Sequence, residues 1–149
     1  MIGLIVTGHG KFASGFEGSL NLLAGAQEGV VFVDFDGESG EALKEKLAEV
    51  MDSMKEYAGV LVLADLPGGT PYNKSVELKL ERADQTIEVM AGTNLPLLLA
   101  CATMLDTFDT PAELAQASIL DAKDSLVIFG IEVADEGAEE EGGDFDDFI

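Results

Sequence analysis

The only histidine of the chain, His9, stands between two glycines directly after a run of aliphatic residues, in the stretch GLIVTGHGKF. A second polar stretch, ADLPGGTPYN, begins with Asp65 at the end of another aliphatic run and continues into Gly68, Gly69 and Thr70. A carboxylate that accepts a hydrogen bond from one ring nitrogen fixes the imidazole tautomer and leaves the lone pair of the other nitrogen directed outward. His9 is therefore the candidate nucleophile, and Asp65 is its candidate partner.

The Gly-Gly-Thr-Pro segment predicts an anion site beside this pair. Two glycines allow a tight backbone turn, and the following proline suits the first turn of a helix, with Thr70 as the expected cap. Free N–H groups and the positive end of the helix dipole would then favour an anion such as a phosphoryl group. A hydrolytic triad is not indicated, because Ser14 falls on a predicted helix and Cys101 falls in an apolar run.

Composition restricts the class of protein. One cysteine and one histidine exclude an internal disulfide and leave too few ligands for a structural zinc site, so we expect no metal and no cofactor. The unpaired cysteine fits a reducing compartment such as the cytoplasm. The longest apolar stretch, residues 95–105, is interrupted and too short to insert into a membrane. With 29 acidic residues against 8 basic ones, nucleic acid is not an expected partner.

The elements that must position these loops follow from hydrophobic patterning. Four short apolar runs predict buried parallel strands, because they lack the alternation of apolar and polar residues found in a strand with one solvent-exposed face. These runs are residues 2–6, 30–34, 60–64 and 86–90. Helical patterns cover 12–23, 41–54 and 71–80, and two more helices begin near Leu95 and at Pro111, with Thr110 as N-cap. The stretch SLVIFGIEV predicts a fifth strand. The order indicates a three-layer α/β/α sandwich with a mainly parallel sheet of order 2-1-3-4.

The chain divides into an α/β domain, residues 1–133, and an acidic tail, residues 134–149. Asp and Glu take eight of the last fifteen positions, and this composition argues against a packed element. Three apolar residues favour packing of the end of the tail against the domain: Phe145, Phe148 and Ile149.

In an open parallel sheet, ligands bind where the strand order reverses, here between the first and third strands. The loops that carry His9 and Asp65 follow these two strands, so we expect the two side chains to be neighbours.

Three stretches, GLIVTGHGKFASG, VLVLADLPGGTPYN and MAGTNLPLLL, resemble the enzyme IIA domain of the mannose family of the bacterial phosphotransferase system. The resemblance covers residues 1–133. It implies that His9 accepts a phosphoryl group on Nε2 from phospho-HPr, with Nδ1–H directed to Asp65, and passes it to enzyme IIB, which phosphorylates the incoming sugar. It also implies that Gly68, Gly69 and Thr70 help to hold the phosphoryl group, and that transfer needs no metal.

The same resemblance implies a homodimer with an antiparallel last strand, residues 126–133, which members of the family often exchange between subunits; whether it is exchanged here stays open. The membrane subunits IIC and IID would be indirect partners and would select the sugar, which this chain does not reveal. The acidic tail departs from the shorter members of the family.

Two other functions remain open at this point. A phosphohistidine domain of this kind can also pass its phosphoryl group to dihydroxyacetone kinase or signal to a regulatory partner. Only the partner proteins distinguish these functions from sugar uptake. The stretch GHGKFA also fits a dinucleotide fingerprint, with Asp34 or Asp36 at the expected distance along the chain. That interpretation leaves the Asp65 loop unexplained, and 149 residues leave no room for the usual substrate domain.

Overall fold

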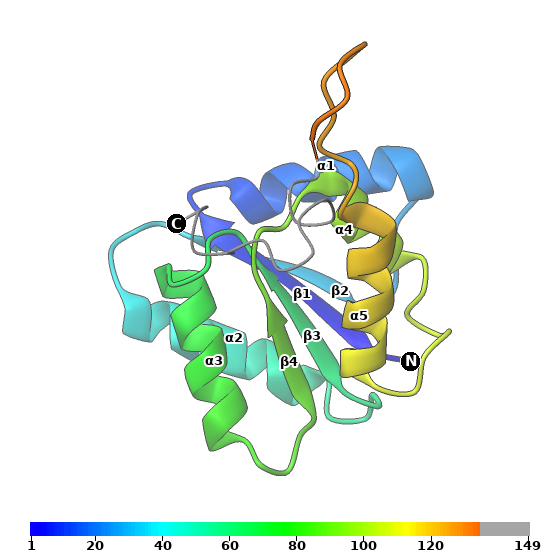
Figure 1. Ribbon diagram of the computed structural model, residues 1–149. Helices are drawn as coiled ribbons and strands as arrows, with labels where there is room; N and C mark the ends of the chain where they lie inside the picture. The colour runs from blue at the N-terminus through cyan, green and yellow to red at the C-terminus, as the bar shows by residue number, and fades with distance from the viewer. Residues whose placement is uncertain (135–149) are drawn as a thin grey trace, which may run out of the picture.

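The computed structural model describes residues 1–134. Strands and helices alternate through most of this part of the chain, and two successive helices follow the last strand (Figure 1). The elements are β1 (Gly3–His9), α1 (Phe12–Ala24), β2 (Val30–Phe35), α2 (Gly40–Ser53), β3 (Val60–Ala64), α3 (Thr70–Glu81), β4 (Ile87–Met90), α4 (Leu95–Ala102) and α5 (Pro111–Ala122).

The four strands form one parallel sheet with the order β2-β1-β3-β4, as the sequence predicts. In its register, Leu4 of β1 lies opposite Val30 of β2 and Leu61 of β3. All five residues of β3 and the first six of β1 are buried. Helices cover both faces of the sheet, which explains why these strands are apolar at successive positions and do not alternate.

Each face of the sheet has its own core. Leu4, Val6 and Leu63 pack with α1, α4 and α5 on one face, whereas Ile5 and Val62 pack with α2 and α3 on the other. Figure 1 shows these two helical layers on opposite sides of the strands. The described residues therefore form the expected α/β/α sandwich.

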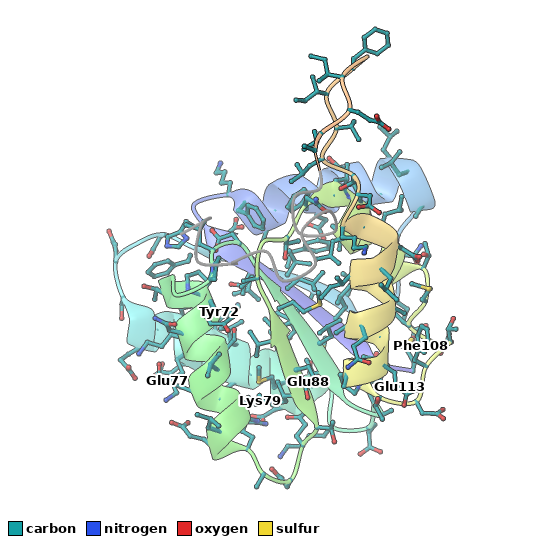
Figure 2. All side chains as sticks on the ribbon, in the orientation of Figure 1. Tyr72, Glu77, Lys79, Glu88, Phe108 and Glu113 are labelled. Atoms are coloured by element: carbon teal, nitrogen blue, oxygen red, sulfur yellow. The ribbon has the colours of Figure 1, made fainter. Side chains whose placement is uncertain are left out.

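Surface ion pairs link α2 and α3, the helices of the second layer, to each other and to the sheet. Lys79 of α3 donates to Glu88 of β4 over 2.7 Å, a contact that can be followed in Figure 2. Lys44 of α2 is 2.7 Å from Glu81 at the end of α3. These pairs connect α3 with the sheet and with α2. The first turn of α3, with Tyr72, lies at the carboxyl edge of the strands because the helix begins soon after β3 ends (Figure 2).

The expected fifth strand is not formed within residues 1–134 of one chain. Residues 126–133, which we call the arm, leave the end of α5 and project away from the sheet (orange in Figure 1). The arm contains only an isolated bridge between Ile128 and Ile131, with Gly130 in a left-handed conformation between them. Its large apolar side chains are exposed: Leu126, Val127, Ile128, Phe129, Ile131 and Val133. A strand needs a neighbour for its backbone groups, and the arm finds none within residues 1–134. The proposed tail residues Phe145, Phe148 and Ile149 lie outside the described residues.

Candidate functional site

The site lies at the carboxyl edge of the two central strands. His9 is the last residue of β1, and Asp65 follows the last residue of β3 directly. The two strands are paired neighbours, with Thr7 opposite Ala64. Their ends therefore bring His9 and Asp65 together, as the topology argument predicts, although 56 positions separate them in the sequence.

The contact between His9 and Asp65 has two points. The backbone N–H of His9 donates to Oδ2 of Asp65 over 2.9 Å, and the ring Nδ1 lies 2.7 Å from the same oxygen. Oδ1 of the carboxylate accepts a third bond, of 2.8 Å, from the backbone N–H of Leu66. The carboxylate is thus held by three donors, two from His9 and one from its own loop.

The ionisation of Asp65 decides which nitrogen of His9 carries the proton. Burial raises the pKa of this carboxyl, but the hydrogen bonds from His9 and Leu66 outweigh burial and lower the pKa below its ordinary value. An ionised carboxylate only accepts hydrogen bonds, so Nδ1 is assigned as the donor and Nε2 keeps its lone pair. The side chain of Asp65 is 10% exposed and that of His9 is 43% exposed. The carboxylate is therefore shielded while the imidazole can reach a reaction partner.

Two glycines shape the loop around the imidazole for different reasons. Gly68 has a φ of +81°, a left-handed conformation that other residues rarely adopt. At Gly69 the limit is space, because a Cβ atom there would lie 2.9 Å from Cε1 of His9 and 3.3 Å from the carbonyl oxygen of Leu66. The loop is closed by a 2.9 Å bond from the Asn73 side chain to the Gly68 carbonyl. The backbone of residues 68 and 69 can approach the ring only because no side chain intervenes.

The start of α3 differs from the sequence prediction. Thr70 is the first residue of the helix and Gly69 occupies the N-cap position, so the expected capping role of Thr70 is wrong. No side chain caps this helix, since glycine has no acceptor to offer. The backbone N–H groups of Thr70 and Tyr72 therefore lack both an intrahelical acceptor and a cap. They follow Gly69, which lies against the imidazole of His9, and they stand at the positive end of the helix dipole, an arrangement that favours an anion.

Sequence reasoning missed one side chain that contacts the imidazole. The ring of Phe35, the last residue of β2, lies against the ring of His9 in a T-shaped arrangement, with 5.7 Å between the ring centroids. The signal was present, because Phe35 ends a predicted strand beside the one that carries His9. An aromatic residue in an apolar run nevertheless looks like ordinary core until the register is known.

The carboxylates proposed for nucleotide binding have other partners. Oδ1 of Asp34 accepts a 2.9 Å bond from the backbone N–H of Ser14 and so caps the start of α1. In a dinucleotide fold that helix start faces the pyrophosphate. A carboxylate placed there repels such a group. Asp36 accepts from the N–H of Glu38 over 2.9 Å within a turn.

Two lysines close to the site loops in sequence lie outside the reacting centre. Lys74, which flanks the loop in sequence, pairs with Glu41 at 2.9 Å and with Glu77 at 3.1 Å. Lys11 lines an open hollow of about 460 Å³ beside Asp34 and Phe35.

No three His, Cys, Asp or Glu side chains within residues 1–134 are grouped to share a metal ion. No helix in that part of the chain combines the length and apolar character needed to cross a bilayer.

Comparison with known proteins decides the family. The family model described as the PTS system fructose IIA component, EIIA-man, matches residues 3–118. The chain belongs to this family. The match confirms the mannose-family resemblance, and it makes this IIA chain a component of a sugar phosphotransferase system.

Individual relatives agree with this IIA assignment. The chain is 37% identical over 100 residues to the fructose-specific EIIA component of Bacillus subtilis, an overlap of 66% of this chain and 67% of the relative. It is 31% identical over 137 residues to the mannose-specific EIIAB component of Escherichia coli, but spans only 38% of that protein. The crystal structure of the phosphotransferase component EIIA from Streptococcus agalactiae matches with a TM-score of 0.81 and 35% identity, covering 87% of this chain and 98% of that one.

Proposed function

We propose that this IIA chain is a phosphocarrier in which His9 accepts a phosphoryl group from phospho-HPr and passes it to enzyme IIB, for coupled sugar uptake and phosphorylation. One observation carries the proposal. The 2.7 Å contact between Nδ1 and Asp65 engages one nitrogen of a ring that is 43% exposed, so the other nitrogen is left for chemistry. The family assignment supplies the class of reaction.

The chemical step follows from this geometry. The lone pair on Nε2 of His9 attacks the phosphorus of the donor phosphohistidine, and an N–P bond forms as the donor N–P bond breaks. The electron pair of the broken bond stays on the donor nitrogen. As Nε2 becomes bonded, positive charge develops on the ring of His9, and the carboxylate of Asp65 stabilises that charge through Nδ1–H. Transfer to enzyme IIB is the same step with His9 as the donor.

The start of α3 is the proposed binding site for the phosphoryl oxygens. Gly68 and Gly69 bring the backbone close to the imidazole, and Thr70 adds a hydroxyl at the first helical position. Uncapped N–H groups at a helix start bind anions because the donors and the dipole act together. No metal or cofactor enters this step, since the phosphoramidate already carries the transfer potential.

The arm supports a homodimer. Its exposed apolar side chains gain most from burial against a second copy, in which residues 126–133 would add an antiparallel strand. We place the carrier in the cytoplasm, where its unpaired Cys101 stays reduced, with the membrane subunits IIC and IID as indirect partners. A variant truncated after Ser125 should be monomeric by sedimentation if the arm makes the dimer. Truncation after Ala134 removes only the acidic tail and should leave both dimer and transfer intact.

Phosphorylation is the first test. The protein is incubated with phosphoenolpyruvate, enzyme I and HPr, and its intact mass is measured with and without acid treatment. We expect one acid-labile, base-stable phosphoryl group in the wild type and none in His9→Ala, because no other imidazole exists in the chain. Asp36→Asn, changed at the same edge of the sheet, is the matched control and should be labelled normally. Full labelling of His9→Ala would overturn the assignment.

A second incubation separates sugar uptake from a regulatory role or a role beside dihydroxyacetone kinase. The labelled protein is mixed with candidate IIB proteins and the label on each is followed. Transfer to a IIB protein is the outcome that the proposal requires, and label that moves only to another class of partner would redirect it.

A further inference from the structure

The imidazole of His9 is held from both sides of its strand. On the β3 side, Asp65 binds Nδ1. On the β2 side, Phe35 lies opposite His9 in the parallel register, and the two ring planes meet at 68° with centroids 5.7 Å apart. The two neighbours of β1 therefore each contribute one contact to the same ring.

The hydrogen bond from Nδ1 does not by itself fix the ring. The terminal torsion of a histidine side chain has a broad energy minimum, and when both side-chain torsions change together the ring can tilt about Nδ1 while the bond to Asp65 is kept. Nε2 lies on the far side of the ring from the Cβ attachment and moves with that tilt. A contact against the ring itself is needed to hold the attacking lone pair in one direction.

Phe35 is placed to supply that contact because it cannot move aside. Its side chain is 7% exposed and packs in the core with Leu43 and Leu47 of α2. Its carbonyl oxygen accepts a 2.7 Å bond from the backbone N–H of Gly10, the residue after His9. Backbone and side chain of Phe35 are thus both tied to the segment that carries the imidazole.

We infer that Phe35 is a positioning residue, which acts through His9 by restricting the tilt of the imidazole so that Nε2 points at the incoming phosphorus. The inference rests on the proposed phosphocarrier function for its kinetic consequence. Transfer between two imidazoles requires the attacking nitrogen to be near and aligned, and small losses of alignment reduce rates strongly. Phe35 touches neither the phosphoryl group nor a partner in this role.

The test compares the same substitution on the two faces of β2. Phe35→Leu removes the aromatic contact, and Phe32→Leu makes the same change three residues earlier on the opposite face, where the side chain packs with the other core. Phe35→Tyr keeps the ring, at a position that borders an open hollow. Transfer rates from phospho-HPr are corrected for the folded fraction of each variant.

We expect Phe35→Leu to lose roughly 2- to 10-fold in transfer rate, the range that one aromatic pair is worth. Phe35→Tyr should retain the wild-type rate, and Phe32→Leu should do so as well. Equal rates for Phe35→Leu and Phe32→Leu would overturn the inference. If Phe35→Leu does not fold, Phe35→Met, which fills the space with an unbranched side chain, replaces it in the comparison.

A second measurement does not depend on phosphoryl transfer. The ¹³C relaxation of the His9 ring C–H groups reports the motion of the ring in the unphosphorylated protein. A ring held in one orientation is expected in the wild type and in Phe35→Tyr, and ring motion of larger amplitude is expected in Phe35→Leu. Unchanged ring motion in Phe35→Leu contradicts the positioning role even if the rate falls. Increased ring motion in a protein that HPr does not phosphorylate would instead support the positioning role and reject the proposed function.

Discussion

Asp65→Asn is the substitution that most directly tests the electrostatics of the site. The two side chains have nearly the same shape, but Asn carries one acceptor oxygen where Asp has two. In the wild type, Oδ2 accepts from the backbone and ring of His9, and Oδ1 accepts from Leu66. An Asn oxygen placed toward His9 turns the amide NH₂ against the N–H of Leu66. The opposite orientation turns the NH₂ against the N–H of His9 and makes Nδ1 an acceptor, which moves the ring proton to Nε2.

The magnitude follows from the bonds that change. A hydrogen bond to a charged group contributes about 1.5–3 kcal/mol and a neutral one about 0.5–1.5 kcal/mol, so loss of the charge weakens the support of the ring by about 1–2 kcal/mol. Loss of the correct tautomer adds to this, because a protonated Nε2 has no lone pair for attack. We therefore expect transfer from phospho-HPr to fall roughly 10- to 100-fold, the range found for carboxylates that orient a metal-bound histidine.

Rapid-quench measurement with labelled phospho-HPr gives the rate constant for this step directly. Asp36→Asn is the matched control, because it removes one negative charge at the same edge of the sheet from a carboxylate that bonds only to the Glu38 N–H among residues 1–134. That variant should transfer at the wild-type rate. A wild-type rate in Asp65→Asn, with the protein folded, would refute the argument that the charge of Asp65 supports His9.

Three further outcomes are expected. Gly69→Ala should slow transfer by pushing the ring of His9 out of line, since the added Cβ would lie 2.9 Å from Cε1. Gly18→Ala, in open space on α1, should instead raise the free energy of unfolding by about 0.5–1 kcal/mol and leave the transfer rate unchanged. Transfer assays and urea denaturation check both variants. Hydrogen bonding lowers the pKa of Asp65 in the folded protein, so its contribution to stability is present above the ordinary value of 3.8 and is lost as the pH falls through the folded-state pKa. Urea titrations in acid should therefore show a smaller acid-induced loss of stability in Asp65→Asn than in the wild type, and parallel losses would contradict this. Burial raises the pKa of the Cys101 thiol to about 11, so thiol reagents at mildly alkaline pH should label it only on unfolding, and rapid labelling of the native protein would contradict the buried position.

Most of the fold could be predicted from the sequence because its signals are local. A strand buried on both faces is apolar at consecutive positions, and β3 was predicted with the bounds that the structure has. The start of α5 was equally clear, since Thr110 accepts from the N–H of Glu113 as an N-cap and Pro111 follows it. These features depend on a few neighbouring residues, and a linear pattern contains them completely.

Two predictions depend on contacts made from elsewhere in the molecule or from a second copy. The capping role of Thr70 is wrong, because the helix starts one residue earlier, where Gly69 of the loop after β3 lies against His9. The fifth strand stays a prediction, because a strand exists only when a neighbour completes its hydrogen bonds, and residues 1–134 of one chain offer none. Composition alone therefore does not distinguish a formed strand from a segment that pairs only with a partner.

The sequence by itself determined which chemistry is available. It contains one imidazole, so the nucleophile has a single candidate, and it places a carboxylate and two glycines in the loop after the third strand. Only the tertiary structure decided how these groups act together. The order β2-β1-β3 puts Asp65 2.7 Å from Nδ1 and brings Phe35, from the strand on the other side of β1, against the same ring. The physical reason is that strand order and register set distances between residues far apart in the chain, and both result from the packing of the whole sheet between its helices.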